Sequence, residues 1–433
     1  MMLLGLLCSS SSAPCYPTFQ QCTGFRNVNL NWPTSENAKM NRDLKYWKEA
    51  ATVILTSGIR NCFVDKGSTS TQGCQPPHSV SKQETDVIHS WLEMPVFDYA
   101  VLMLRRSAKS SFMPHAQVFP GGTVSPSDFS SEWIQMFQPF CKPPNFKLGT
   151  VKQTSKRPPI LAMDRRKLGS EIPGEVAFRI CAIRETFEES GILLVKPNTP
   201  ETCLSSQGAI KLPQYDQKEL ANWKPLVQKN AANFIKLCKQ LDCIPNIWAL
   251  KEWSNWLTPT YMKRKRFDTA FFICCLQEIP FTMQDGHETV SYNWMSPSDF
   301  IEGYNLGKFY FAPPQWYELS RLCRLPRFQD LQQFCHHRAL EGCERWLPIH
   351  LLASDGYAIL YPGDELYPED PDYTGEKEMN FTSSKTLEQL RLEVTRLHRM
   401  ELRDQYFTLY VNIEPQYKHL KPLIMNTIVS SHL

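Results

Sequence analysis

The sequence contains no apolar stretch near the roughly 20 residues that a helix needs to cross a bilayer, so we expect no membrane span. Net charge is also small, because 47 lysines and arginines stand against 44 aspartates and glutamates. Nucleic-acid binding leaves a clustered basic face on a basic domain. The net charge of +3 alone neither favours nor excludes such binding. Because the chain is not markedly basic, we expect no nucleic-acid partner. With 42% hydrophobic and only 21% charged residues, a disordered charged chain is excluded.

Glycine is scarce beside proline, at 19 residues against 32, which indicates several stiff, non-helical connections. Internal repeats are lacking as well. A length of 433 residues favours two or three domains, or one elaborated domain with long insertions.

The 15 cysteines lack a compact spacing pattern, and several lie within apolar runs. An odd count without such a pattern favours reduced thiols that pack as small hydrophobic groups in a reducing compartment. One set of residues leaves a zinc site open as an alternative: Cys323, Cys335, His336, His337 and Cys343. Structural zinc sites usually contain two Cys-x2–4-Cys pairs, and this set has none, so we favour ordinary thiols.

The two ends of the chain carry conflicting address signals. Residues 1–43 begin with a short apolar run that resembles the core of a secretory signal, but a basic segment before it is missing. We expect these residues to form a poorly ordered leader. The last three residues, Ser431-His432-Leu433, are a close variant of the Ser-Lys-Leu peroxisomal address. This variant predicts a peroxisomal location and an import receptor as partner.

Apolar patterns predict the main elements of secondary structure. We expect strands at 50–55, 99–104, 267–276 and 290–294, of which 99–104 and 267–276 should be buried, and a hairpin around Ser354-Asp355-Gly356. Helices are expected at 175–190 and from Ala312 onward, helical or mixed segments at 232–241 and 245–256, and a later helix that carries Leu387, Leu390, Val394 and Leu397.

Residues 141–174 are rich in proline and in basic side chains, namely Lys142, Lys147, Lys152, Lys156, Arg157, Arg165, Arg166 and Lys167. Basic side chains in such a segment either contact phosphates or lie on a solvated surface. We interpret the segment as a solvated insertion.

The clearest helix, 175–190, separates an apolar stripe from an acidic face. The stripe consists of Val176, Ile180, Ile183 and Phe187, which recur at the spacing of one helix face. Glu185, Glu188 and Glu189 project on the other side, and Gly191 ends the helix. Three carboxylates on one face repel one another unless a cation compensates them. A hard ion such as Mg²⁺ is one explanation, and a solvated charged face is the other.

The residues from Arg184 to Ile192 resemble the second half of the Nudix box, Arg-Glu-U-x-Glu-Glu-x-Gly-U, in which U is apolar. The first half, Gly-x5-Glu, is approximated by Gly122 to Asp128, directly after Pro120-Gly121. Between Asp128 and Arg184 lie 55 residues where the pattern has 7, so the box is split by an insertion of 48. Thr186 stands at an apolar position, and Asp128 replaces the first glutamate.

A split box narrows the resemblance to the peroxisomal acyl-coenzyme A diphosphatases of the nucleoside diphosphate-linked moiety X motif 19 type. The segments that carry it include Val118–Gly122, Ala177–Glu185, Ile247–Leu250, Trp256–Pro259, Arg266–Thr269, Ala312–Gln315 and Trp346–Ile349. The resemblance implies a Nudix α/β/α sandwich with a mixed sheet at 44–305, with insertions at about 60–96 and 129–175. Residues 306–433 are expected to form a C-terminal α+β extension.

The resemblance also implies the reaction: hydrolysis of the pyrophosphate of coenzyme A and acyl-coenzyme A to 3′,5′-ADP and (acyl-)4′-phosphopantetheine. Glu185 and Glu189 are expected to hold Mg²⁺ or Mn²⁺, with Glu188 as a third ligand or as the base for the attacking water. Arg184 is expected to orient a helix glutamate. Gly121 and Gly122 are expected to let the loop approach helix and substrate closely.

Three further residues are candidates with a plain surface role as the alternative. Glu288 lies where some Nudix enzymes carry another carboxylate. Lys263 and Arg264 belong to the densest basic cluster and are candidates for the 3′-phosphate of coenzyme A. Two other functions remain open at this stage: a Nudix pyrophosphatase acting on NADH or ADP-ribose, and a non-catalytic Nudix-like binding module.

Overall fold

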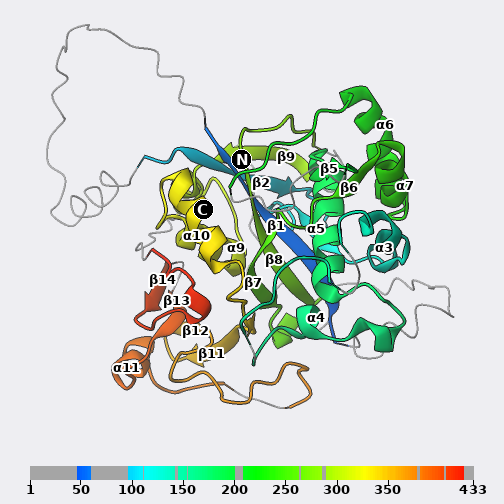
Figure 1. Ribbon diagram of the computed structural model, residues 1–433. Helices are drawn as coiled ribbons and strands as arrows, with labels where there is room; N and C mark the ends of the chain where they lie inside the picture. Colours follow the sequence, from blue (N-terminus) through cyan, green and yellow to red (C-terminus); the bar gives the residue numbers. More distant parts are fainter. Residues whose placement is uncertain are drawn as a thin grey trace, which may run out of the picture.

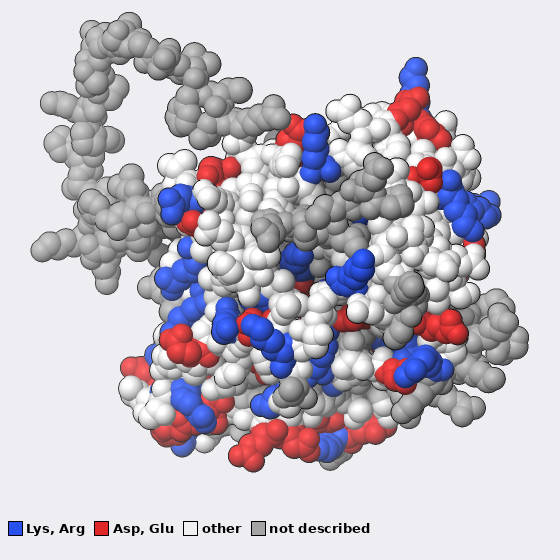
Figure 2. Space-filling model, in the orientation of Figure 1, with Lys and Arg blue, Asp and Glu red and all other residues white. Residues whose placement is uncertain are grey.

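The computed structural model describes residues 46–59, 96–110, 112–141, 145–153, 155–199, 208–262, 265–284, 289–377, 381–403 and 406–423. Within these ranges no helix is both long and apolar enough to cross a membrane. Basic and acidic side chains are interspersed on the face drawn in Figure 2, in keeping with the small net charge.

An eight-stranded mixed sheet forms the centre of the molecule (Figure 1). Its strands follow the order β10 (Arg345–Trp346), β7 (Lys251–Leu257), β8 (Phe267–Leu276), β1 (Lys48–Gly58), β2 (Tyr99–Arg106) and β3 (Gln117–Val118), while β4 (Gly121–Thr123) pairs with β1 and β9 (Thr289–Met295) pairs with β2. β1 and β8 run parallel, and β1 meets β4 in its first half and β2 in its last residues. This pairing places the glycines of β4 against the start of β1.

Side chains of the central strands alternate between two hydrophobic cores. From β1, Ala51, Val53 and Leu55 enter one core, whereas Ile54 enters the other. β8 divides in the same way, with Phe272 on the first side. Because successive residues of a strand point to opposite faces, a strand buried on both faces reads as one continuous apolar run. The strands expected at 50–55, 99–104, 267–276 and 290–294 are confirmed.

Helices cover both faces of this sheet, so the expected α/β/α sandwich is confirmed (Figure 1). Residues of the first core come from α3 (Glu132–Phe137), α4 (Pro159–Ala162), α5 (Gly174–Ser190), α6 (Gln217–Lys229) and α7 (Asn233–Gln240). Residues of the second core come from α8 (Pro297–Asn305), α9 (Pro313–Leu322) and α10 (Phe328–Arg338). Two short strands, β5 (Val195–Pro197) and β6 (Cys243–Pro245), pair with each other after α5 and α7.

A second, four-stranded antiparallel sheet follows in the C-terminal part: β11 (Ile349–Ala353), β12 (Gly356–Leu360), β13 (His398–Arg403) and β14 (Tyr406–Val411). The expected hairpin joins β11 to β12. The expected helix through Leu397 is wrong beyond α11 (Leu387–Leu392). The chain leaves the helix there because the residues from His398 onward pair with both neighbouring strands.

Two further expectations need correction. Residues 245–256 are not a helical segment, since Pro245 ends β6 and Lys251–Leu257 form β7, which pairs with β8 and β10. Nor is the segment 141–174 simply solvated. Its Ile160 and Ile172 are buried in the first core, and its Arg165 is buried against Glu49 at 2.7 Å. The insertion therefore contributes to the domain's core.

Candidate active site

The C-terminal half of α5 brings three carboxylates and one guanidinium close to β4. The apolar stripe of this helix is fully buried, as its spacing predicts. Gly191 ends the helix with a φ of 72°, a left-handed conformation that glycine adopts without strain. Glu185 and Glu188 keep 14% of their side-chain surface exposed, whereas Glu189 is buried. One helix thus presents two partly accessible carboxylates beside a buried one.

Arg184 is the centre of the charge network. Its Nε and Nη2 atoms donate to both carboxylate oxygens of Asp128, at 2.8 and 2.9 Å. Its Nη1 donates to Glu185 at 2.8 Å and to Glu188 at 2.7 Å. Burial lowers the pKa of Arg184, but the charges of Asp128 and Glu185 outweigh it and raise the pKa well above its ordinary value. A single buried cation therefore fixes the positions of three carboxylates.

Asp128 replaces a glutamate of the family pattern, yet it reaches the arginine. It lies in the short 3₁₀ helix Pro126–Phe129, where its Oδ2 also accepts the backbone N–H of Ser125 at 2.8 Å. This turn lies against α5 and shortens the distance that the carboxylate must span. The two halves of the box, separated by 55 residues in the sequence, are adjacent in space.

The glycines of β4 touch the carboxylates directly. The backbone N–H of Gly121 donates to Oε2 of Glu189 at 2.9 Å. A side chain at Gly121 would overlap the backbone of β1, since its Cβ would lie 2.6 Å from the Cα of Thr52. At Gly122, a Cβ would lie 2.5 Å from the carboxylate carbon of Glu185. The close approach expected at this loop is present at both positions.

Residues outside the box support the end of α5, and the sequence carried no signal for them. On α6, the side-chain amide of Gln228 donates to the carbonyl of Glu188 at 2.8 Å. The backbone N–H of Met283 donates to the carbonyl of Ser190 at 2.8 Å, and the ammonium of Lys224 donates to the Met283 carbonyl at 3.2 Å. The helix end that carries the carboxylates is therefore held from α6 and from the loop after β8.

The chemistry of these side chains suits a hard divalent cation, because carboxylate oxygens are the ligands that Mg²⁺ and Mn²⁺ accept. Burial, together with the charge of Glu185, raises the pKa of Glu188 to about 7 against the opposing charge of Arg184. Burial and neighbouring negative charge both disfavour the ionised form of Glu188, and a bound cation would favour it. Across the described ranges, no three His, Cys, Asp or Glu side chains converge on one point as metal ligands. At this site, Arg184 and the Gly121 N–H engage the carboxylates instead.

Some expected site residues lie outside the described part of the chain. These are Glu288, Lys263 and Arg264, together with the terminal residues 431–433. Of the possible zinc ligands, Cys323, Cys335 and Cys343 are buried free thiols, whereas His336 and His337 are exposed.

The sandwich, the helix with its three glutamates and the loop glycines together define the class of a Nudix hydrolase. A family model described as the NUDT19 Nudix domain matches residues 47–322, and one for the NUDT19 C-terminal domain matches residues 350–412. The chain belongs to the NUDT19 family of Nudix hydrolases.

Named relatives match most of the chain. The Acyl-coenzyme A diphosphatase NUDT19 of Xenopus laevis is 47% identical over 90% of this chain and 98% of its own. The protein of that name from Gallus gallus is 44% identical over 91% of this chain and 99% of its own. The one from Homo sapiens is 38% identical over 89% of this chain and 97% of its own.

Proposed function

We propose that this chain is an acyl-coenzyme A diphosphatase. Water is added across the pyrophosphate of coenzyme A or acyl-coenzyme A, which yields 3′,5′-ADP and 4′-phosphopantetheine or its acyl form. The observation that carries the proposal is the carboxylate cluster on α5, organised by Arg184, in a chain whose relatives bear that activity in their name. NADH and ADP-ribose contain the same kind of linkage and are the competing substrates.

Glu185 and Glu189 would hold Mg²⁺ or Mn²⁺, and Glu188 would act as a third ligand or as the base for the attacking water. When bound, the ion would neutralise pyrophosphate charge and lower the pKa of a water molecule. Arg184 contributes by holding Glu185 and Glu188 in fixed orientations through bonds of 2.8 and 2.7 Å. The N–H of Gly121 fixes Glu189 in the same way. Preorganisation of this kind reduces the reorganisation that the reaction requires.

Product identification tests the proposal most directly. The purified full-length protein is incubated with Mg²⁺ and, in separate reactions, coenzyme A, an acyl-coenzyme A, NADH and ADP-ribose. We expect phosphopantetheine species to form faster than AMP from the other two substrates. If AMP forms as fast or faster, the coenzyme A assignment is wrong. Chelation of the metal should stop the reaction, and added Mg²⁺ or Mn²⁺ should restore it.

Glu189→Gln tests the assignment of the site. We expect turnover to be abolished while the far-ultraviolet circular dichroism and the unfolding midpoint stay close to those of the wild type. Glu175→Gln is the matched control, because Glu175 lies at the other end of α5 and pairs with Arg157 at 3.3 Å. An unaltered rate in Glu189→Gln would remove this residue from the site.

A peroxisomal location is part of the proposal, and its support is the terminal tripeptide Ser431-His432-Leu433. Deletion of these three residues should move a fluorescently tagged protein from peroxisomes to the cytosol and abolish binding to the import receptor. Replacement by Ser-Lys-Leu is the control and should keep the peroxisomal pattern. A peroxisomal pattern that survives the deletion would contradict the tripeptide as the address.

A further inference from the structure

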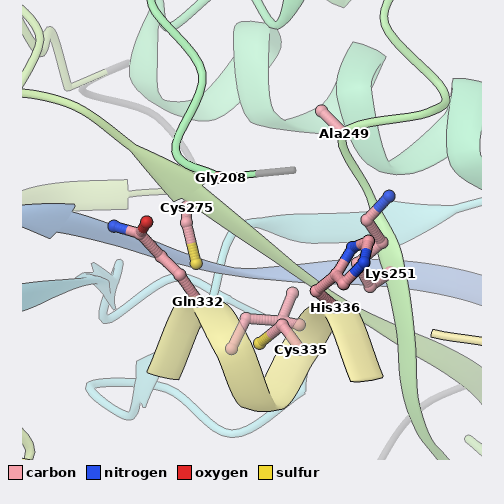
Figure 3. Close-up of a pocket in the computed structure, with 8 residues that line it drawn as sticks. Gly208, Ala249, Lys251, Cys275, Gln332, Cys335 and His336 are labelled. Carbon is pink, nitrogen blue, oxygen red and sulfur yellow. The ribbon is translucent and has the colours of Figure 1, made fainter. Parts of the chain in front are cut away.

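Two thiols from different elements face a small cavity on the side of the sheet opposite α5 (Figure 3). Cys275 comes from β8 and Cys335 from α10, and both side chains are buried. The cavity measures about 20 Å³, which is room for one water-sized molecule. The exposed residues Gly208 and His336 also line it, so a small solute has a short path to the thiols.

The surroundings of the pair make one thiol more acidic than the other. The thiols of Cys275 and Cys335 line the same cavity and interact with each other across it. The hydroxyl of Thr56 donates to the sulfur of Cys275 at 3.4 Å. The interaction with Cys335 contributes most to lowering the pKa of Cys275, against the opposing effect of burial, and the hydroxyl of Thr56 and the charge of Lys251 lower it further. The same interaction and burial raise the pKa of Cys335.

Cys274 provides the contrast within the same strand. Cys274 directly precedes Cys275 in β8 and points to the opposite core, and burial raises its pKa. Reactive cysteines combine thiolate character with access, whereas cysteines buried in apolar surroundings are inert. Only one of these two adjacent residues meets both conditions.

We propose that Cys275 and Cys335 form a peroxide-responsive dithiol. The thiolate of Cys275 attacks one oxygen of hydrogen peroxide, the O–O bond breaks, and the departing hydroxide takes a proton and leaves as water. Cys275 is then a sulfenic acid. The thiol of Cys335 attacks its sulfur, a second water leaves, and a disulfide links the two residues. Overall, two thiols and one hydrogen peroxide give one disulfide and two water molecules.

The disulfide would join α10 to the central sheet. The chain between residues 275 and 335 contains β9, α8 and α9, so the bond would close a long loop. Closing such a loop restricts the unfolded chain and stabilises the folded one. We expect the oxidised protein to unfold at a temperature about 5 °C higher than the reduced protein. This effect does not depend on the proposed activity.

Peptide mapping of the full-length wild-type protein tests the proposal without any variant. After mild treatment with hydrogen peroxide, alkylation and non-reducing digestion, we expect a peptide pair linked through Cys275 and Cys335. Its mass should be two hydrogens below the sum of the two free peptides. The absence of this pair, or a predominant link between other cysteines, would overturn the proposal.

Two variants and a larger oxidant sharpen the test. Cys335→Ser should accumulate a sulfenic acid at Cys275, detectable with dimedone added together with a denaturant that opens the cavity, whereas Cys274→Ser should form the disulfide as the wild type does. No dimedone adduct in Cys335→Ser, or loss of the disulfide in Cys274→Ser, would contradict the assigned order. Cumene hydroperoxide is too large for the cavity and should react at least tenfold more slowly than hydrogen peroxide. Equal rates would exclude the cavity as the place of reaction.

Discussion

Substitution of Gly122 by alanine would displace one carboxylate of the proposed metal site while leaving the backbone in place. The backbone of Gly122 accepts an L-residue, because its φ is not positive, and it pairs with Ala51 of β1. An added Cβ would lie 2.5 Å from Cδ and 2.8 Å from Oε1 of Glu185. The group that must move is thus the end of a flexible side chain.

The size of the displacement follows from these distances. Non-bonded carbon atoms approach to about 3.5 Å, so the carboxylate must retreat by about 1 Å. A misplacement of 1 Å in an active site can cost about 100-fold in rate. An off-rotamer side chain costs only about 0.5–1.5 kcal/mol, and alanine in place of glycine recovers part of that. We therefore expect a loss of about 100-fold in kcat/KM with little change in stability.

The assay is steady-state hydrolysis of coenzyme A, together with thermal unfolding of the same preparation. Gly208→Ala is the matched control, since the nearest atom to its added Cβ is Oε1 of Gln332 at 3.4 Å, an ordinary contact. Activity of Gly122→Ala above a third of the wild-type kcat/KM, with unchanged unfolding, would refute the reasoning. It would mean that the position of Glu185 does not limit the reaction.

Two predictions concern stability. Asp128→Asn leaves the buried guanidinium of Arg184 without its bidentate partner and should lower the free energy of urea unfolding by about 3–5 kcal/mol. Asp330→Asn, which breaks an exposed pair with Arg327, should cost less than about 1 kcal/mol, and equal losses would contradict the argument. Burial lowers the pKa of His398 to about 4, below the 6.5 of an unperturbed side chain. The stability that the neutral His398 side chain contributes is therefore complete above pH 6.5, and it declines by about 1.4 kcal/mol per pH unit towards pH 4. In His398→Gln, the free energy of urea unfolding should depend less on pH than in the wild type. The same dependence on pH in both proteins would show that His398 is not its source.

The arrangement of the candidate site could largely be predicted from local sequence, because spacing along a helix determines which side chains share a face. Glu185, Glu188 and Glu189 share a face wherever that helix forms, and the apolar stripe requires it to pack on the sheet. The strands buried on both faces could be predicted as well, because a continuous apolar run of this length, such as Phe267–Leu276, is typical of a buried strand. Segments with a mixed pattern, such as 245–256, could not be predicted from the sequence, because pairing with neighbouring strands determined their conformation.

The sequence by itself determined the acidic helix face, the glycines that must approach it and the two halves of the box. Only the tertiary structure decided that Asp128 meets Arg184 across an insertion, that this insertion packs into the core, and that α6 braces the helix end through Gln228. It also decided that Cys275 and Cys335 share a cavity while Cys274 does not. The physical reason is distance along the chain: spacing within one element follows from backbone geometry, whereas contacts between remote segments depend on how whole layers pack.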